Sequence, residues 1–223
     1  MEDQKINRTI LRYMIQNDYD VLEAENGAQA WSILEENSEE IIAILLDIVM
    51  PVMDGYEFLK RLKDSPWEGI PVIAMTGDSD ISTEERTLEL GAWDFIIKPY
   101  KERILMTRLK NAIARSRMGY LQQMKHMAEH DSVTGLYNRM HFFKKTEEML
   151  KKYPTEPFVF IRMDIKRFRL INSYWGEEVG NRILCFMGDL LREISGHYSH
   201  CTFGRIESDI FGICIPYEEG DCE

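Results

Sequence analysis

The sequence predicts two consecutive domains, an α/β domain with a flavodoxin-like, doubly wound parallel sheet and an α+β domain. Apolar strands alternate with helical segments over residues 1–100, with short connections, which is typical of a parallel sheet covered by helices on both faces. Two apolar runs, 41–51 and 157–165, carry an acid near their end and predict buried strands. A chain of 223 residues suits two domains of ordinary size.

In the first half, the expected elements follow one another in the order that such a sheet requires. Apolar residues at helical spacing predict a helix over 4–17, and alternation predicts a strand over 19–25, before Asn26-Gly27 turns the chain. The remaining expected elements are a helix through Ala30 and Leu34, the strand 41–51, a helix that opens at Asp54-Gly55, a strand over 71–75, a helix over 82–90 closed by Gly91, and a strand over 93–97.

The composition excludes several classes of function. The formal net charge of −11 and the pI near 5.0 oppose direct binding to nucleic acid or to an anionic membrane. The four cysteines have no C-x-x-C spacing, so neither a zinc site nor a disulfide framework is indicated. The sequence has no signal peptide and no apolar run as long as a membrane span, and we therefore expect a cytoplasmic protein.

Polar residues stand at the ends of three expected strands. Asp47 ends one strand, Thr76 follows the next, and Lys98 follows the last. Because the carboxyl ends of parallel strands meet at one edge of a sheet, these side chains should converge. A carboxylate nucleophile, a hydroxyl donor and an amine are the groups that phosphoryl transfer to a carboxylate requires. Each residue alone has another interpretation, as a helix cap or a solvated loop residue, but together they predict a phosphorylation site.

Four motifs in the first half carry a family resemblance. They are Glu2-Asp3, LLDIVMPVMDG (45–55), MTG (75–77) and LGAWDFIIKPY (90–100). Through them, residues 2–110 resemble the receiver domain of two-component response regulators, which implies a flavodoxin-like sheet, a cognate histidine kinase and a Mg²⁺ cofactor. The resemblance assigns these roles: Asp47 as phospho-acceptor, Glu2 and Asp3 as Mg²⁺ ligands together with Asp47, Thr76 and Lys98 as contacts of the phosphoryl group, and Phe95 as the switch aromatic.

One part of the family pattern is missing from the sequence. Receiver domains have an apolar strand immediately before the acidic pair, and here Met1 stands in that place. Because that strand is an interior one, its absence would expose two strand edges and much of the core. We expect a truncated sequence, another segment in the gap, or a damaged domain, and we expect upstream residues to raise the stability of the domain.

Residues 102–130 are expected to form a helical linker between the receiver, residues 1–101, and a second domain, residues 131–223. Apolar residues at alternating spacings of three and four predict a weak coiled coil, and hence a homodimer formed through this helix or through the receiver. The alternative is an amphipathic helix packed on its own domain. The residues of the expected seam are Met106, Leu109, Ile113, Tyr120 and Met127.

The second domain is expected to be a short α+β arrangement around a hairpin. Its first segment, DSVTGLYNR (131–139), contains a Thr-Gly turn that precedes a helix. A hairpin of the last two strands would place Asp209 near Asp164, which lies in the apolar run described above. The later expected elements are a strand over 157–165, a helix over 177–194, and strands over 202–206 and 210–215.

DSVTGLYNR and the block MDIKRFRLINSYWGEEVGN (163–181) resemble the GGDEF domain of diguanylate cyclases in a degenerate, shortened form. In the family signature, two glycines admit the GTP phosphates and two acids follow, whereas this loop reads Glu207-Ser208-Asp209-Ile210-Phe211. Side chains would occupy the phosphate space, and an isoleucine cannot position a proton. The resemblance implies Asp164 and Asp209 as a residual metal site, and Asn172 and Asn181 as possible guanine contacts for GTP bound weakly without turnover.

Three functions are compatible with these observations. The leading one is a response regulator, phosphorylated on Asp47, that signals through a GGDEF-like module without cyclase activity in cyclic-di-GMP signalling. The alternatives are an active diguanylate cyclase that makes cyclic-di-GMP from GTP, and a structural adaptor with neither activity. Because the family's domain continues further, we also expect a longer parent chain with an EAL-type output domain.

Overall fold

The computed structural model describes residues 1–77 and 81–217, and the chain forms two compact units, Met1–Tyr120 and Leu121–Glu223. The boundary between the units falls inside one helix, α5 (Glu102–Glu129). The finer division into a receiver, a linker and a second domain at residues 101 and 130 stays a prediction.

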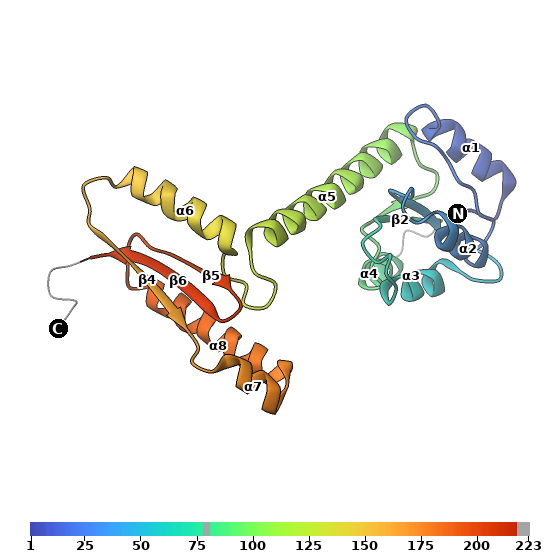
Figure 1. Cartoon of the computed structure of the whole chain (residues 1–223). Helices are drawn as coiled ribbons and strands as arrows, with labels where there is room; N and C mark the ends of the chain where they lie inside the picture. Colours follow the sequence, from blue (N-terminus) through green and yellow to red (C-terminus); the bar gives the residue numbers. More distant parts are fainter. Residues whose placement is uncertain (78–80, 218–223) are drawn as a thin grey trace. The chain divides into compact units, whose positions relative to one another are not determined.

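The first unit is a parallel sheet with helices on both faces (Figure 1). Its strands lie in the order β1 (Ile44–Asp47), β2 (Val72–Thr76) and β3 (Asp94–Ile97). This arrangement confirms the expected doubly wound α/β fold. The helices of the unit are α1 (Lys5–Ile15), α2 (Gly27–Asn37), α3 (Gly55–Lys63), α4 (Ile81–Glu89) and the first part of α5.

The central strand β2 is buried along its whole length, and its side chains alternate between two cores. Val72 and Ala74 belong to the core that α2 and α3 cover, whereas Ile73 and Met75 belong to the core that α1 and α5 cover. This alternation follows the two-residue period of a strand. It explains why the strand is apolar at consecutive positions, as strands of parallel sheets are when both faces are buried.

Two strand predictions for this unit need correction. Residues 19–25, all of them described, form no strand, although the Ala24 carbonyl accepts a hydrogen bond of 3.1 Å from the Glu2 N–H. The expected strand 41–51 is reduced to the four residues of β1, with Val49 75% exposed. An alternating or apolar sequence forms a strand only where a neighbouring strand can pair with it. In the described chain, only Met1 and Glu2 lie between β1 and residues 19–25, where a pairing strand would be needed.

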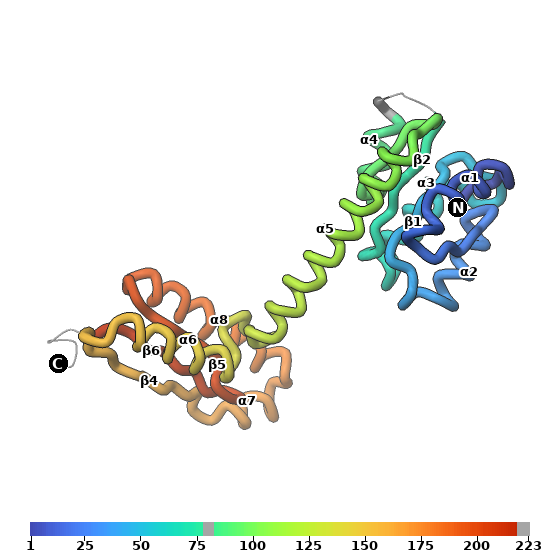
Figure 2. Tube along the Cα trace, turned by 90° about the horizontal axis from the view of Figure 1, so that it is seen from above, coloured from blue at the N-terminus to red at the C-terminus, as the bar shows by residue number. Residues whose placement is uncertain are grey.

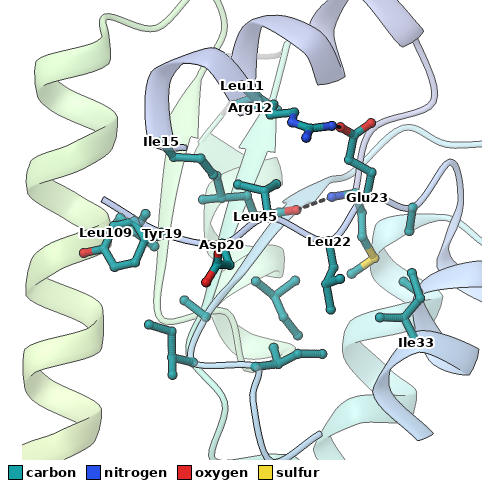
Figure 3. A pocket seen from close by; sticks show the side chains of 18 of the residues that line it. Leu11, Arg12, Ile15, Tyr19, Asp20, Leu22, Glu23, Ile33, Leu45 and Leu109 are labelled. Atoms are coloured by element: carbon teal, nitrogen blue, oxygen red, sulfur yellow. Dashed lines mark hydrogen bonds and ion pairs between the residues drawn. The ribbon is translucent and has the colours of Figure 1, made fainter. Parts of the chain in front are cut away.

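A groove of about 480 Å³ lies between β1 and residues 20–24 (Figure 3). At one end, the Met1 backbone nitrogen donates to the Leu45 carbonyl at 2.7 Å, and the Asp47 N–H donates to the Met1 carbonyl at 3.1 Å. These two bonds have the pattern of a parallel ladder, so Met1 occupies the position of a strand beside β1. The apolar lining of the groove includes Leu11, Ile15, Leu22, Ile33 and Leu109.

The loop after β1 contains a strained residue. Val52 has a φ of 70° and is 84% exposed. A β-branched side chain is disfavoured in this left-handed region. We expect Val52→Gly to raise the free energy of unfolding of the first unit by about 1 kcal/mol, because the relief of strain exceeds the entropy that glycine adds to the unfolded chain. Urea denaturation measures the difference. Val49→Gly is the matched control and should not stabilise; a loss of stability in Val52→Gly would contradict the prediction.

The second unit is an antiparallel sheet with helices on both faces, and it confirms the expected α+β class (Figures 1 and 2). Its strands lie in the order β4 (Phe158–Asp164), β6 (Ile210–Pro216) and β5 (Thr202–Glu207). The helices are α6 (Arg139–Lys152), α7 (Phe168–Trp175) and α8 (Glu177–Ser195). Of these helices, α7 was not expected from the sequence.

Close packing of α6 on the sheet depends on glycines. Phe142 of α6 is fully buried, and a Cβ atom at Gly204 would lie 2.7 Å from the Phe142 Cβ. A Cβ atom at Gly212 would lie 2.8 Å from the Phe142 ring. On the other face, Phe211 packs in one core with Leu184 of α8. The central strand β6 is therefore covered on both sides.

Helix α5 changes its environment along its length. Leu109 and Ile113 are buried in the core of the first unit, so this part of the expected seam packs on its own domain, as the alternative interpretation expected. Tyr120 and Met127 are 63% and 67% exposed. Only the second part of the seam is therefore open to a partner helix. None of the helices in the described chain, α5 included, combines the length and the apolar character needed to cross a membrane.

Candidate functional site

The carboxyl end of the parallel sheet holds an acidic pocket. Asp47 is the last residue of β1, and Glu2 and Asp3 reach the same place from the N-terminal segment. One ligand oxygen from each of the three lies within 4.8 Å of the others, which makes this the one group of three possible metal ligands in the described residues. Glu2 is 0% exposed and Asp47 is 4% exposed. Glu2 and Asp47 are buried and close together, so their charges repel one another unless a cation or a proton offsets them.

Lys98 supplies one positive charge to this pocket. It follows β3, and its N–H donates to the Thr76 carbonyl at 2.7 Å. Its Nζ lies 2.7 Å from Glu2 Oε2 and 2.6 Å from Asp47 Oδ2. The ammonium group therefore bridges the two buried carboxylates.

The structure also places the two remaining residues of the expected phosphorylation site. Thr76 ends β2, next to the end of β1, and is 4% exposed. Phe95 is half-buried in β3, and its ring lies 5.8 Å from the Arg108 guanidinium carbon. The strand ends thus bring Asp47, Thr76 and Lys98 to one edge of the sheet, while the roles expected for these residues stay predictions.

Burial and charge shift the protonation of the pocket. Burial raises the pKa of the Asp47 carboxyl above its ordinary value, with a contribution from Glu2, although Lys98 acts in the opposite direction. Burial would also raise the pKa of Glu2, but hydrogen bonds from Lys98 and Asn7 bring it below its ordinary value. For Lys98, burial lowers the pKa, and the two carboxylates outweigh burial and raise it. One ammonium does not neutralise three acids, so a divalent cation would relieve the remaining repulsion.

Sequence reasoning missed the residue that holds the acidic pair in place. Arg8 of α1 is 9% exposed, and its Nη1 donates to the carbonyls of Glu2 and Asp3, at 2.8 Å each. Its Nη2 lies 2.5 Å from Glu25 Oε1. The available signal was a basic residue three positions before the buried Leu11, on the face of α1 that packs inward.

A glycine allows α3 to approach the end of β1. A Cβ atom at Gly55 would lie 2.6 Å from the Asp47 carbonyl oxygen and 2.7 Å from the Ile48 Cα. Asp54 caps the helix, because its side chain accepts a hydrogen bond of 2.8 Å from the Glu57 N–H. The sequence Asp54-Gly55 therefore positions the loop that follows Asp47.

The hairpin of the second unit lies beside Asp164. The ladder of β4 and β6 pairs Asp164 with Ile210, the residue after Asp209, as the expected hairpin requires. Arg205 anchors the turn: its Nε donates to the Ser208 carbonyl at 2.6 Å, and its Nη1 lies 3.0 Å from Asp131 Oδ1. Asp164 and Asp209, the two acids of the expected metal site, do not belong to a group of three possible metal ligands in the part of the chain that the structure describes.

The two expected guanine contacts differ in their surroundings. Asn172 Oδ1 is buried and lacks a hydrogen-bond partner among the described residues. It lies 1.9 Å from the position that a Cβ atom of Gly180 would take, so Gly180 makes room for the amide. Asn181 lies on α8 and is exposed. A buried amide oxygen without a partner is an unusual feature that a ligand could satisfy.

Two family models match the chain at these sites. Residues 1–110 match the response regulator receiver domain, and residues 128–221 match the diguanylate cyclase GGDEF domain. The chain is a receiver domain followed by a GGDEF domain. A receiver domain implies a cognate histidine kinase.

Similar proteins cover about half of this receiver–GGDEF chain. "Histidine kinase P4" of Formosa agariphila is 34% identical over 51% of this chain and 8% of its own length. The transcriptional regulatory protein SrrA of Staphylococcus aureus is 28% identical over 55% of this chain and 49% of its own length. A solved receiver domain of the sensor histidine kinase PA1611 from Pseudomonas aeruginosa, with a magnesium ion in its active-site cleft, is 28% identical, covers 51% of this chain and 93% of its own, and has a TM-score of 0.46. The chain thus spans less than half the length of these two curated relatives.

Proposed function

We propose that the chain is a phosphorylation-controlled response regulator, in which Asp47 accepts the phosphoryl group and the GGDEF domain transmits that state without making cyclic-di-GMP. The observation that supports this best is the acidic pocket itself. Asp47 Oδ2 lies 2.6 Å from the Lys98 ammonium, within a group of three carboxylates. Buried acids with a shared cation at a strand end are costly for stability, and a site for chemistry explains why they are present.

The residues of the pocket define the chemistry that we propose. The three carboxylates offer the hard oxygen donors that Mg²⁺ prefers, and bound Mg²⁺ would neutralise charge on the incoming phosphoryl group. An Asp47 oxygen forms the new bond to phosphorus while the bond from phosphorus to the donor's leaving atom breaks; that atom is an imidazole nitrogen in a phosphohistidine and an oxygen in acetyl phosphate. Lys98 then pairs with a phosphoryl oxygen, and the Thr76 hydroxyl donates to another. The same contacts would pull both strand ends toward the new group.

Phosphorylation of the full chain by acetyl phosphate and Mg²⁺ tests this proposal. We expect the intact protein to gain the mass of one phosphoryl group and Asp47→Asn to gain none, because an amide is not a nucleophile at phosphorus. Asp64→Asn, which changes an exposed acid at the end of α3, is the matched control and should react fully. Equal labelling of Asp47→Asn would contradict the proposed acceptor, and no labelling of any form would favour a structural adaptor.

The proposal that the GGDEF domain is inactive rests on its signature loop. Ser208, in the place of a signature glycine, has a φ of 45°, and Glu207 is exposed with Arg139 at 3.8 Å. Ile210 is the first residue of β6, pairs with Asp164 of β4, and has no group that accepts a proton. The competing function is an active cyclase. Incubation of the chain with GTP and Mn²⁺, followed by chromatography of the products, distinguishes the two, since any cyclic dinucleotide would overturn the proposal.

Weak binding of GTP without turnover is the second part of this proposal. The buried Asn172 amide oxygen, which has no partner in the described chain, supports it. We expect calorimetry to detect GTP binding in the wild type and about fivefold weaker binding in Asn172→Ala, because one net hydrogen bond contributes about 1 kcal/mol. Ser173→Ala, the exposed neighbour on α7, is the control and should bind as the wild type does. Unchanged affinity in Asn172→Ala would remove the guanine assignment.

We also propose that the chain forms a homodimer through the second part of α5. Tyr120, Met124 and Met127 follow a four-and-three spacing and are all exposed. A second copy of the helix would bury this stripe as a short coiled coil. The mass of the chain in solution, measured by light scattering, tests this proposal. An EAL-type output domain stays a prediction.

A further inference from the structure

Three of the five histidines of the chain gather where α5 ends, and the proposed function uses none of them. His126 lies in the last turn of α5, His130 follows the helix, and His141 lies in the first turn of α6. The ring centroids of His126 and His130 are 4.1 Å apart, and Tyr137 lies 5.1 Å from His130 and 4.7 Å from His141. These side chains form a continuous row of rings within the second unit.

The backbone holds His126 and His130 one helical turn apart on the same face. The His130 N–H donates to the His126 carbonyl at 2.8 Å, so the helical hydrogen-bond pattern continues through both residues. Their rings are stacked, with an angle of 20° between the planes. Residues four apart on a helix are neighbours, so the two imidazoles can turn a nitrogen each toward one metal ion when their side chains rotate out of the stack.

The ring of His130 is oriented by its surroundings. Its Nδ1 lies 3.0 Å from the Gly135 carbonyl oxygen. Because a carbonyl oxygen only accepts hydrogen bonds, this contact places a proton on Nδ1, so the neutral imidazole would offer its lone pair at Nε2. This is the arrangement found around metal-binding histidines, where one ring nitrogen donates to a carbonyl and the other binds the ion.

The turn that carries this carbonyl is itself held to the end of α5. The Asn138 side-chain amide donates to the Ala128 carbonyl at 2.7 Å, and the Asn138 N–H donates to the Glu129 carbonyl at 3.0 Å. The Asp131 N–H donates to the Leu136 carbonyl at 2.8 Å. His130 therefore belongs to a well-braced turn, which lowers the ordering cost of binding an ion there.

We propose that His126 and His130 form a binding site for a divalent transition-metal ion of the Zn²⁺ class, with water completing the coordination. Imidazole nitrogens suit Zn²⁺, Ni²⁺ and Cu²⁺, whereas Mg²⁺ prefers oxygen ligands. The site is therefore chemically distinct from the acidic pocket of the receiver. Glu129, which lies 3.8 Å from His141 Nδ1, adds a negative charge nearby that favours a cation. A bound ion would fasten the last turn of α5 to the turn that opens the GGDEF domain.

Titration of the full chain with Zn²⁺ by calorimetry tests the site. The titration is done in saturating Mg²⁺, so that the acidic pocket is occupied, and in a reductant without thiols. We expect His126→Ala and His130→Ala each to weaken the tightest Zn²⁺ site by about tenfold or more, since even the loss of a group that only orients a ligand costs roughly 10–100-fold. His197→Ala, which changes a histidine elsewhere in the second unit, is the matched control and should bind as the wild type does.

A second measurement separates this site from Zn²⁺ bound elsewhere, for example at cysteine. Hydrogen exchange of the amides of residues 126–130 should slow with Zn²⁺ in the wild type and in His197→Ala, and should not respond in His126→Ala. His126 is exposed, so its replacement should leave the fold intact. Unchanged Zn²⁺ affinity in both histidine variants, or no Zn²⁺ binding by the wild type, would overturn the proposal.

Discussion

Five apolar residues added directly before Met1 are expected to raise the free energy of unfolding of the receiver by on the order of 3–5 kcal/mol. The groove beside β1 is the reason. Leu45 and Asp47 direct backbone groups into it, where Met1 already forms two ladder bonds, at 2.7 and 3.1 Å. Added residues would continue this ladder along β1 and fill about 480 Å³ of apolar space. Burying each apolar side chain stabilises the fold by about 1.5–3 kcal/mol, which exceeds the entropic cost of about 1–2 kcal/mol for ordering each backbone unit.

The direction of the ladder defines the control for this experiment. Ile44 and Ile48 donate their N–H groups to Pro71 and Met75 on the side of β2, so the groups of Leu45 point away from β2 and into the groove. A Gly-Ser extension of the same length could form some of the backbone bonds but would leave the space unfilled, and it should stabilise much less. Thermal and urea melts of the three forms measure the effect. Equal stability of the apolar and Gly-Ser forms would show that the groove does not accept a strand.

Lys98→Met is expected to lower the free energy of unfolding of the first unit by about 2–3 kcal/mol at pH 8 without divalent cations. The substitution keeps the apolar length of the side chain but leaves Glu2 and Asp47, 0% and 4% exposed, without their shared positive charge. The expected loss is below that of a fully buried pair, because the Lys98 side chain is 24% exposed. Mg²⁺ should restore part of the stability by binding the folded form alone.

The pH dependence of this loss follows from Asp47. Burial already raises the pKa of its carboxyl in the folded protein, and without Lys98 the pKa would rise further. An acid whose pKa is raised by folding stabilises the folded state when protonated and destabilises it as the pH rises through the raised pKa. The deficit of Lys98→Met should therefore be smaller at pH 5 than at pH 8. Lys101→Met, at an exposed position, is the control. An equally large loss of unfolding free energy in Lys101→Met would refute the explanation, and so would a loss in Lys98→Met that Mg²⁺ does not reduce.

Much of the fold could be predicted because the relevant information is local. Alternating strands and helices, the capping residue Asp54 and the apolar run of β2 each follow from short-range periodicity and turn chemistry. The convergence of Asp47, Thr76 and Lys98 was also predictable, since parallel strands end at one edge of a sheet. The strand expected over residues 19–25 was wrong, because a strand forms only beside another strand, and the sequence of the segment itself does not say whether such a neighbour is present.

The sequence by itself therefore determined the organisation of an α/β domain followed by an α+β domain and the residues that could meet at the strand ends, because both depend on the order and spacing of residues along the chain. Only the tertiary structure decided how the charges pair. Lys98 bridges Glu2 and Asp47, Arg8 holds the acidic pair through backbone carbonyls, and His130 is oriented by Gly135. Such contacts depend on side-chain directions and distances of a few ångström between separate segments, which sequence periodicity does not specify.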